Sequence, residues 1–285
     1  MPTPDATLSG TFAIGGDMVV HRLGFGAMRI TGRGIWGPPA DPDECRRTIR
    51  RVRELGIDFI DTAEAYGPYL SEEMLAEELS PYGNIVVATK GGHSRTGPDA
   101  WIPIGRAEYI IQGVKLSLRR LKLEQHPLWQ LHRIDVKTPK AEQFGAIAEM
   151  RKQGLIRHVG LSEVNVAEIK EAQAYFPVAS VQNKYSITDR NSEDVLEFCE
   201  AHGIALIPWR PIDGGNATGA PAFKALMQAH GASASQLSLA WLLKRSPVML
   251  PIPGTGKVAH LEENTAAAGI KLSDADFATI DALGR

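Results

Sequence analysis

The sequence predicts an α/β fold, a (β/α)8 TIM barrel with an N-terminal β-hairpin. Eight short, β-rich apolar runs alternate with segments of helical spacing, which is typical of βαβ units around a parallel sheet. Three helical segments are followed by the same helix–Gly–apolar phrase, ELGID, KQGLI and AHGIA, as expected where a helix leads into the next strand. The chain of 285 residues is also long enough, because such a barrel needs about 250.

The hairpin is predicted at residues 11–21 (TFAIGGDMVVH), where two alternating arms flank Gly15-Gly16-Asp17. The barrel strands that follow are short, and the first of them is interrupted by glycines. They are predicted at 22–28, 57–61, 84–90, 128–132, 158–162, 179–183, 204–208 and 248–252.

The helices are predicted from apolar spacing together with start and stop signals. Asp41 and Pro42 mark the start of the first helix and Gly56 its end, while Asp189 or Ser192 can cap the sixth. The segments are 44–55, 71–79, 106–121, 139–153, 166–174, 192–202 and 235–245, with a short final helix at 273–283.

No linker or low-complexity segment divides the chain, so we expect a single barrel domain over residues 1–285 with a helical tail at 265–285. The stretch 213–221 (DGGNATGAP) is expected to be a functional loop after the seventh strand. The alternative is a doubly wound dinucleotide-binding sheet, because residues 254–259 (GTGKVA) nearly match GxGxxA. However, this match follows the last strand, where a barrel often binds phosphate at a helix N-terminus.

Composition argues against several classes of protein. Lys and Arg (31) nearly balance Asp and Glu (33), giving a net charge of −2, and no dense basic cluster indicates nucleic-acid binding. No apolar run approaches the roughly 18 residues that cross a bilayer, and residues 1–10 do not resemble a secretory signal. Cys45 and Cys199 lie in helical segments with no Cys/His cluster nearby, which predicts buried thiols and no metal site. We expect a cytoplasmic protein.

Polar residues at the strand ends are the candidate site. Asp61, Lys90 and His132 each end an apolar run, and Tyr66 follows the second strand. Each residue alone is more often structural, but the carboxyl ends of barrel strands converge on one mouth. The same reasoning adds Ser162, Glu163, Gln182, Asn183 and Trp209.

This set of side chains predicts proton donation to a carbonyl oxygen. The pKa of a free tyrosine, about 10, is too high for efficient acid–base work near neutrality. A neighbouring Lys90 ammonium would lower the pKa of Tyr66, and Asp61 would keep that ammonium charged and in place. His132 would hold the substrate oxygen. The hydride or nucleophile must come from elsewhere.

Seven motifs, in order from the second strand onward, give the chain a resemblance to the aldo-keto reductases, especially the short bacterial members. The resemblance implies an NADP(H) cofactor, no metal, and a catalytic tetrad of Asp61, Tyr66, Lys90 and His132 with Tyr66 as general acid. The motifs are GIDFIDTAEAYG (56–67), VVATKGG (86–92), WQLHRID (129–135), HVGLSEVN (158–165), SVQNKYS (180–186), ALIPWRPI (205–212) and PIPGTGKVAHLEEN (251–264).

Cofactor-binding positions carry over from the same resemblance. It places Ser162 and Gln182 at the carboxamide, Trp209 stacked on the nicotinamide ring, and residues 255–264 at the adenosine phosphate, ahead of a helix N-terminus that favours an anion. The full implied set is Gly26, Met28, Ser162, Gln182, Trp209, Arg210, Ile212, Thr255, Lys257, His260, Glu263 and Asn264.

Three departures from the family pattern bear on specificity. Glu163 stands where the family often has Asn, and an ionised carboxylate cannot donate to a carboxamide. Gly254 and His260 replace a common Lys and Arg, so NADH is a possible weaker cofactor beside NADPH. Gly92 replaces a common Trp, so the substrate wall is expected from Trp36 or Trp101, for which simple packing is the equal alternative.

The leading hypothesis is therefore an NAD(P)H-dependent reductase of a small aldehyde or ketone. A cofactor-binding regulatory subunit with little turnover is a second possibility. A barrel aldolase would instead use Lys90 as a Schiff base, without need of Trp209 or of residues 255–264. We expect a monomer or weak homo-oligomer with no nucleic-acid or membrane partner.

Overall fold

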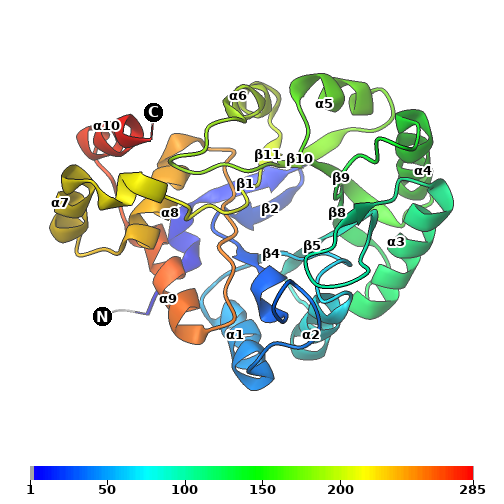
Figure 1. The fold of residues 1–285 in the computed structure, drawn as a ribbon, viewed down its shortest axis with the longest axis horizontal. Coiled ribbons are helices and arrows are strands. Elements are labelled where there is room, and N and C mark those ends of the chain that lie inside the picture. Colours follow the sequence, from blue (N-terminus) through cyan, green and yellow to red (C-terminus); the bar gives the residue numbers. More distant parts are fainter. Residues whose placement is uncertain (1–2, 285) are drawn as a thin grey trace.

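A curved parallel sheet ringed by helices forms the body of the protein (Figure 1). The computed structural model describes residues 3–284. The order of the strands in the sheet is β11-β10-β9-β8-β5-β4-β3, and each neighbouring pair runs parallel. The strands are β3 (Phe25–Gly26), β4 (Phe59–Asp61), β5 (Val86–Gly91), β8 (His126–Leu131), β9 (Ile156–Ser162), β10 (Val178–Gln182) and β11 (Ala205–Leu206).

The predicted eighth strand is an extended segment that closes the barrel between β11 and β3. Leu206 N donates to Val248 O at 2.9 Å on one side, and Gly24 N donates to Pro251 O at 3.0 Å on the other. Pro251 and the proline two residues later have no N–H group to donate, so no continuous ladder forms. The first predicted strand is also shortened, because a 3-10 helix (Ala27–Ile30) follows β3 directly.

The helices agree with the predicted segments to within two residues at the ends, with two additions. Asp41 Oδ1 caps α1 by accepting from Glu44 N, as predicted. Ser192 stands at the N-cap of α6, but its hydroxyl accepts from Asn183 Nδ2 instead of capping. The helices are α1 (Pro42–Glu54), α2 (Leu70–Leu79), α3 (Ala107–Leu121), α4 (Lys140–Lys152), α5 (Val166–Gln173), α6 (Glu193–His202), α7 (Pro221–His230), α8 (Ala234–Arg245), α9 (Val258–Ala266) and α10 (Asp274–Leu283).

Helix α7 is an addition that the sequence reasoning missed. The loop predicted at 213–221 becomes a 3-10 helix (Gly215–Gly219) and then α7. The signals were present, because Pro221 is its first residue and Gly231 ends it in the left-handed conformation at φ 57°. The other addition, α9, begins where the turn after the eighth strand was expected to lead into a helix.

The N-terminal hairpin closes the amino-terminal end of the barrel. Strands β1 (Thr11–Ile14) and β2 (Met18–His21) pair antiparallel, as predicted, and lie across the centre of the ring in Figure 1. His21 N donates to Asp58 Oδ1, just ahead of β4. Ile14 and Met18 pack with residues of the barrel interior that include Phe59. The hairpin therefore fills the amino-terminal end of the barrel, and the carboxyl-terminal end remains open for a functional site.

Both cysteine thiols are buried and unbonded to each other, as predicted. Cys45 lies on α1, where its Sγ is 3.7 Å from Gly256 O, and Cys199 lies on α6. Within residues 3–284, no helix combines the length and apolar character needed to cross a membrane.

Candidate active site

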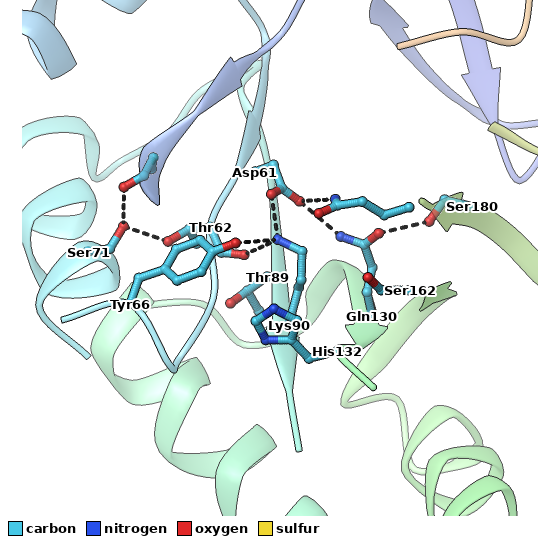
Figure 2. A network of polar contacts seen from close by, with 12 residues as sticks. Asp61, Thr62, Tyr66, Ser71, Thr89, Lys90, Gln130, His132, Ser162 and Ser180 are labelled. Carbon is cyan, nitrogen blue, oxygen red and sulfur yellow. Dashed lines mark hydrogen bonds and ion pairs between the residues drawn. The ribbon is translucent and has the colours of Figure 1, made fainter. Parts of the chain in front are cut away.

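The three strand-end residues and Tyr66 converge in one place. Lys90 Nζ lies 2.5 Å from Asp61 Oδ1 and 3.3 Å from Tyr66 Oη, and the Tyr66 and His132 rings are 5.9 Å apart. Figure 2 shows the Lys90 ammonium between Asp61 and Tyr66. The ammonium also donates to Thr62 O at 3.0 Å. All three ammonium hydrogens therefore have an acceptor.

The sheet explains this convergence. β4, β5 and β8 are neighbours, with Asp61 paired to Ala88 and Lys90 paired to Gln130 in their registers. Because alternate side chains of a strand point into the barrel, Asp61 and Lys90 enter the same space from adjacent strands. Tyr66 comes from the turn between β4 and α2.

Asp61 is held in place by two side-chain amides as well as by Lys90. Its Oδ2 accepts from Gln130 Nε2 at 3.0 Å and from Gln182 Nε2 at 2.9 Å. Gln130 in turn accepts from Ser180 Oγ at 3.4 Å (Figure 2). A buried carboxylate is stable only when it is paired and hydrogen-bonded, and both conditions hold here.

The structure corrects the expected direction of the Tyr66 pKa. Burial of the phenol is the main cause and raises the pKa of Tyr66 above its ordinary value, although the Lys90 ammonium acts in the opposite direction and Asp61 adds to the rise. The same burial disfavours the charge on Lys90, but Asp61 and Tyr66 hold the pKa of Lys90 above its usual value. Tyr66 is thus a protonated donor beside a charged lysine.

His132 is a neutral imidazole in this site. Its burial is the largest cause, followed by the proximity of His93 and Lys90, and together they lower its pKa well below the usual value. The His93 ring lies 4.4 Å from the His132 ring, and burial lowers the pKa of His93 to about 4. A neutral imidazole offers one N–H donor and one acceptor.

A cavity of about 660 Å³ opens above these residues. It extends from the tetrad toward the start of the loop that leads to α9. The predicted site residues on its walls are Gly26, Met28, Asp61, Tyr66, His132, Ser162, Gln182, Trp209, Arg210 and Ile212.

Glu163 supports the cavity wall instead of facing into it. Its backbone is left-handed at φ 56°, and its Oε1 accepts from Trp209 Nε1 at 2.5 Å and from Lys184 N at 2.9 Å. The carboxylate therefore fixes the indole of Trp209. Beside it, Ser162 Oγ accepts from Arg133 Nη1 at 2.9 Å.

Trp101, and not Trp36, forms part of the wall. A short hairpin of β6 (His93–Ser94) and β7 (Ile102–Pro103), absent from the predicted elements, carries Trp101 to 6.3 Å from the Tyr66 ring. Trp36 is not among the lining residues; the Arg95 guanidinium packs over it at 5.8 Å and over Trp101 at 3.7 Å. Trp36 packs against Arg95 outside this lining, and its assignment to the substrate wall stays a prediction.

The residues predicted at the adenosine phosphate lie beyond the lining of this cavity, around the start of α9. Lys257 is its exposed N-cap, and Lys257 N donates to Thr255 Oγ1 at 3.1 Å. Glu263 Oε1 accepts from Ser233 Oγ at 2.6 Å, which ties α9 to the cap of α8. His260 is exposed and Asn264 buried on α9.

Several lining residues were missed by the sequence reasoning. His93, Ile35, Asp99 and Arg133 face the cavity from loops or from a two-residue strand, where no strand-end rule applies. Only Arg133 carried a signal, since it directly follows His132. Among the described residues, no three His, Cys, Asp or Glu side chains are grouped to hold a metal ion.

Comparison with known proteins agrees with this architecture. The model of the aldo/keto reductase family matches residues 22–285. An uncharacterized oxidoreductase of Schizosaccharomyces pombe is 55% identical over 282 residues, covering 99% of this chain and 92% of that protein. The pyridoxine 4-dehydrogenase of Escherichia coli is 36% identical, covering 97% of this chain and 99% of the enzyme.

A solved structure gives the same result. The glycerol dehydrogenase of Gluconobacter oxydans superimposes with a TM-score of 0.84 at 26% identity, covering 96% of this chain and 95% of that chain. The family match extends over the barrel and includes Asp61, Lys90, His132 and Tyr66. The chain belongs to the aldo/keto reductase family of oxidoreductases.

Proposed function

We propose that the protein reduces an aldehyde or ketone to the alcohol, with NADPH as the preferred hydride donor and NADH as a weaker one. The observation that carries the proposal is the position of Lys90 Nζ, 3.3 Å from Tyr66 Oη and 2.5 Å from Asp61 Oδ1, at a cavity that His132 also lines. This arrangement pairs a proton donor with a fixed positive charge.

The residues around the cavity fit a reduced nicotinamide cofactor, which supplies the hydride when bound. A carboxamide needs a donor and an acceptor. The Ser162 hydroxyl accepts from Arg133 and keeps its own proton to donate. Gln182 uses its Nε2 on Asp61 and keeps Oε1 to accept. Trp209 offers a flat face that Glu163 holds in place.

The protein's own part in the reaction is proton transfer. Tyr66 Oη donates its proton to the carbonyl oxygen, and the Lys90 ammonium stabilises the phenolate that remains. Asp61 keeps Lys90 charged and placed. Neutral His132 orients the carbonyl oxygen through its ring N–H without adding a second acid.

The same contacts favour reduction over the two alternatives. An aldolase lysine needs a free amine, whereas Lys90 is buried, ion-paired and held above its usual pKa. A regulatory subunit would have no need for an assembled proton donor. The geometry around Tyr66 and Lys90 therefore supports turnover.

The test is loss of the reduced-nicotinamide absorbance with a panel of aldehydes and ketones and with both cofactors. Pyridoxal belongs in the panel, because one relative is a pyridoxine 4-dehydrogenase. Turnover that disappears in Tyr66→Phe supports the proposal. Tight cofactor binding without turnover of any substrate would favour the regulatory subunit, and absence of binding would favour the aldolase.

Lys257→Ala is expected to weaken NADPH binding more than NADH binding. Lys257 is exposed and has no ion-pair partner among the described residues, so its ammonium is available to a phosphate. A charge-assisted hydrogen bond contributes about 1.5 to 3 kcal/mol, which is roughly 10- to 150-fold in Kd. Fluorescence titration with each cofactor measures it. Equal losses for both would place Lys257 away from the phosphate.

Glu163→Ala is expected to weaken both cofactors by a similar factor, up to about tenfold. The change removes the acceptor of Trp209 Nε1 and frees the indole to move. Titration of NADPH and NADH gives the two Kd values, and the emission spectrum of the protein reports the changed surroundings of Trp209. Unchanged affinity for both would show that the orientation of Trp209 does not matter for binding.

Two further proposals concern the location of the protein in the cell and its oligomeric state. We propose that it acts in the cytoplasm as a monomer or weak homo-oligomer. Light scattering across a range of concentrations measures the oligomeric state.

A further inference from the structure

A carboxylate from α1 lies at the N-terminus of α9. Glu44 Oε1 accepts from Val258 N, the first backbone N–H of α9, at 2.9 Å. The other oxygen, Oε2, pairs with Arg47 Nη2 at 2.9 Å. The neighbouring Cys45 Sγ contacts Gly256 O, so α1 packs closely against this turn.

Glu44 is a fixed negative charge at that position. The first N–H groups of a helix have no partner within the helix and attract anions. The hydrogen bond from Val258 N is the largest cause that lowers the pKa of Glu44, and Arg47 adds to it. The carboxylate is therefore ionised at every pH at which the enzyme would be assayed.

This charge lies beside the residues proposed to hold the adenosine end of the cofactor. Lys257 directly precedes Val258 and His260 follows it by two residues, and both side chains are exposed. NADPH and NADH differ only in the 2′-phosphate, which carries a charge of about −1.5 to −2 near neutral pH. A carboxylate beside that phosphate repels it and leaves NADH almost unaffected.

We propose that Glu44 sets the cofactor preference by repelling the 2′-phosphate at the N-terminus of α9. The ratio of the Kd for NADH to the Kd for NADPH is therefore smaller than Lys257 alone would give. The inference rests on the proposed function, because it takes residues 254–264 as the adenosine site. Arg47 moderates the effect, since its guanidinium neutralises part of the Glu44 charge.

The sign of the effect distinguishes this role from simple helix capping. Removing the charge in Glu44→Gln is expected to lower Kd for NADPH by about three- to thirtyfold while Kd for NADH changes less than about twofold. Removing the partner in Arg47→Met is expected to act oppositely and raise Kd for NADPH several-fold. A charge-conserving Glu44→Asp keeps the NADPH-to-NADH ratio near that of the parent.

The experiment is fluorescence titration of the full-length protein with NADPH and with NADH, for the parent and each variant. Glu108→Gln is the matched control, because Glu108 is an exposed carboxylate in the first turn of α3 and pairs with Arg106 at 3.4 Å. It changes the net charge equally and should leave both Kd values unchanged.

Provided that the parent protein binds the cofactors, three results would overturn the inference. Equal changes for NADPH and NADH in Glu44→Gln would mean that Glu44 only holds α9 in place. No change in either Kd, or weaker NADPH binding in that variant, would mean that the carboxylate does not oppose the phosphate. If Glu44→Gln does not fold, an Arg47→Met variant in which the ratio of the NADPH and NADH Kd values is unchanged would overturn the inference instead. A parent that binds neither cofactor would overturn the proposed function as well.

Discussion

Replacing Tyr66 with phenylalanine is expected to lower kcat/KM for carbonyl reduction by roughly 100- to 10,000-fold, the usual contribution of general acid catalysis. The change removes only the Oη that donates the proton and keeps the ring that packs 6.3 Å from Trp101. Kd for NADPH should stay within about twofold of the parent, because no predicted cofactor contact involves the phenol oxygen.

Steady-state kinetics with one good aldehyde, together with a fluorescence titration, separate these two quantities. Tyr82→Phe is the matched control, since the buried Tyr82 Oη has no hydrogen-bond partner among residues 3–284 and its loss should leave kcat/KM unchanged. Activity of Tyr66→Phe within a few-fold of the parent would show that another group supplies the proton.

Replacing Lys90 with methionine is expected to remove most of the activity and about 3 to 5 kcal/mol of stability together. The phenolate of Tyr66 loses its counter-charge, and Asp61, only 2% exposed, loses its ion-pair partner. The double variant Asp61→Asn/Lys90→Met removes both charges, so it should recover much of the stability and none of the activity. Denaturant unfolding and kcat/KM measure the two effects.

The pH profile of the single variants tests the coupling to Tyr66. Reduction requires the protonated phenol, so kcat/KM falls as pH rises through the pKa of Tyr66. Lys90 lowers that pKa and Asp61 raises it, with burial as the largest cause of its high value. Asp61→Asn should therefore move the alkaline limb to lower pH, and Lys90→Met should move it higher. A limb that stays in place in both variants, with chemistry limiting the rate, would contradict the coupling.

The strand-end rule predicted that Asp61, Lys90 and His132 lie together, but it could not predict the walls of the cavity around them. The positions of Asp61, Lys90 and His132 were predictable because parallel strands bring their carboxyl ends together regardless of the conformation of the loops. His93 and Trp101 lie on a hairpin whose strands are only two residues long, too short for any periodicity. Their positions depend on tertiary contacts such as Arg95 over Trp101.

Other differences have equally specific causes. The eighth strand was correctly located, but its prolines prevent a regular ladder. The pKa of Tyr66 was assigned the wrong direction because the sequence shows its charged neighbour but not its depth of burial. The role of Glu163 was hidden for a similar reason, since its left-handed backbone turns the side chain toward Trp209.

The N-terminal hairpin has a consequence for how this barrel can change over evolution. The family match begins at Arg22, yet Ile14 and Met18 already lie inside the barrel against residues such as Phe59 and Leu128. A larger or smaller side chain inside the barrel must therefore be accommodated by the hairpin, which precedes the residues that the family model matches. The barrel interior and the hairpin that closes it therefore form one packed core, and a change of side-chain volume in one requires a matching change in the other.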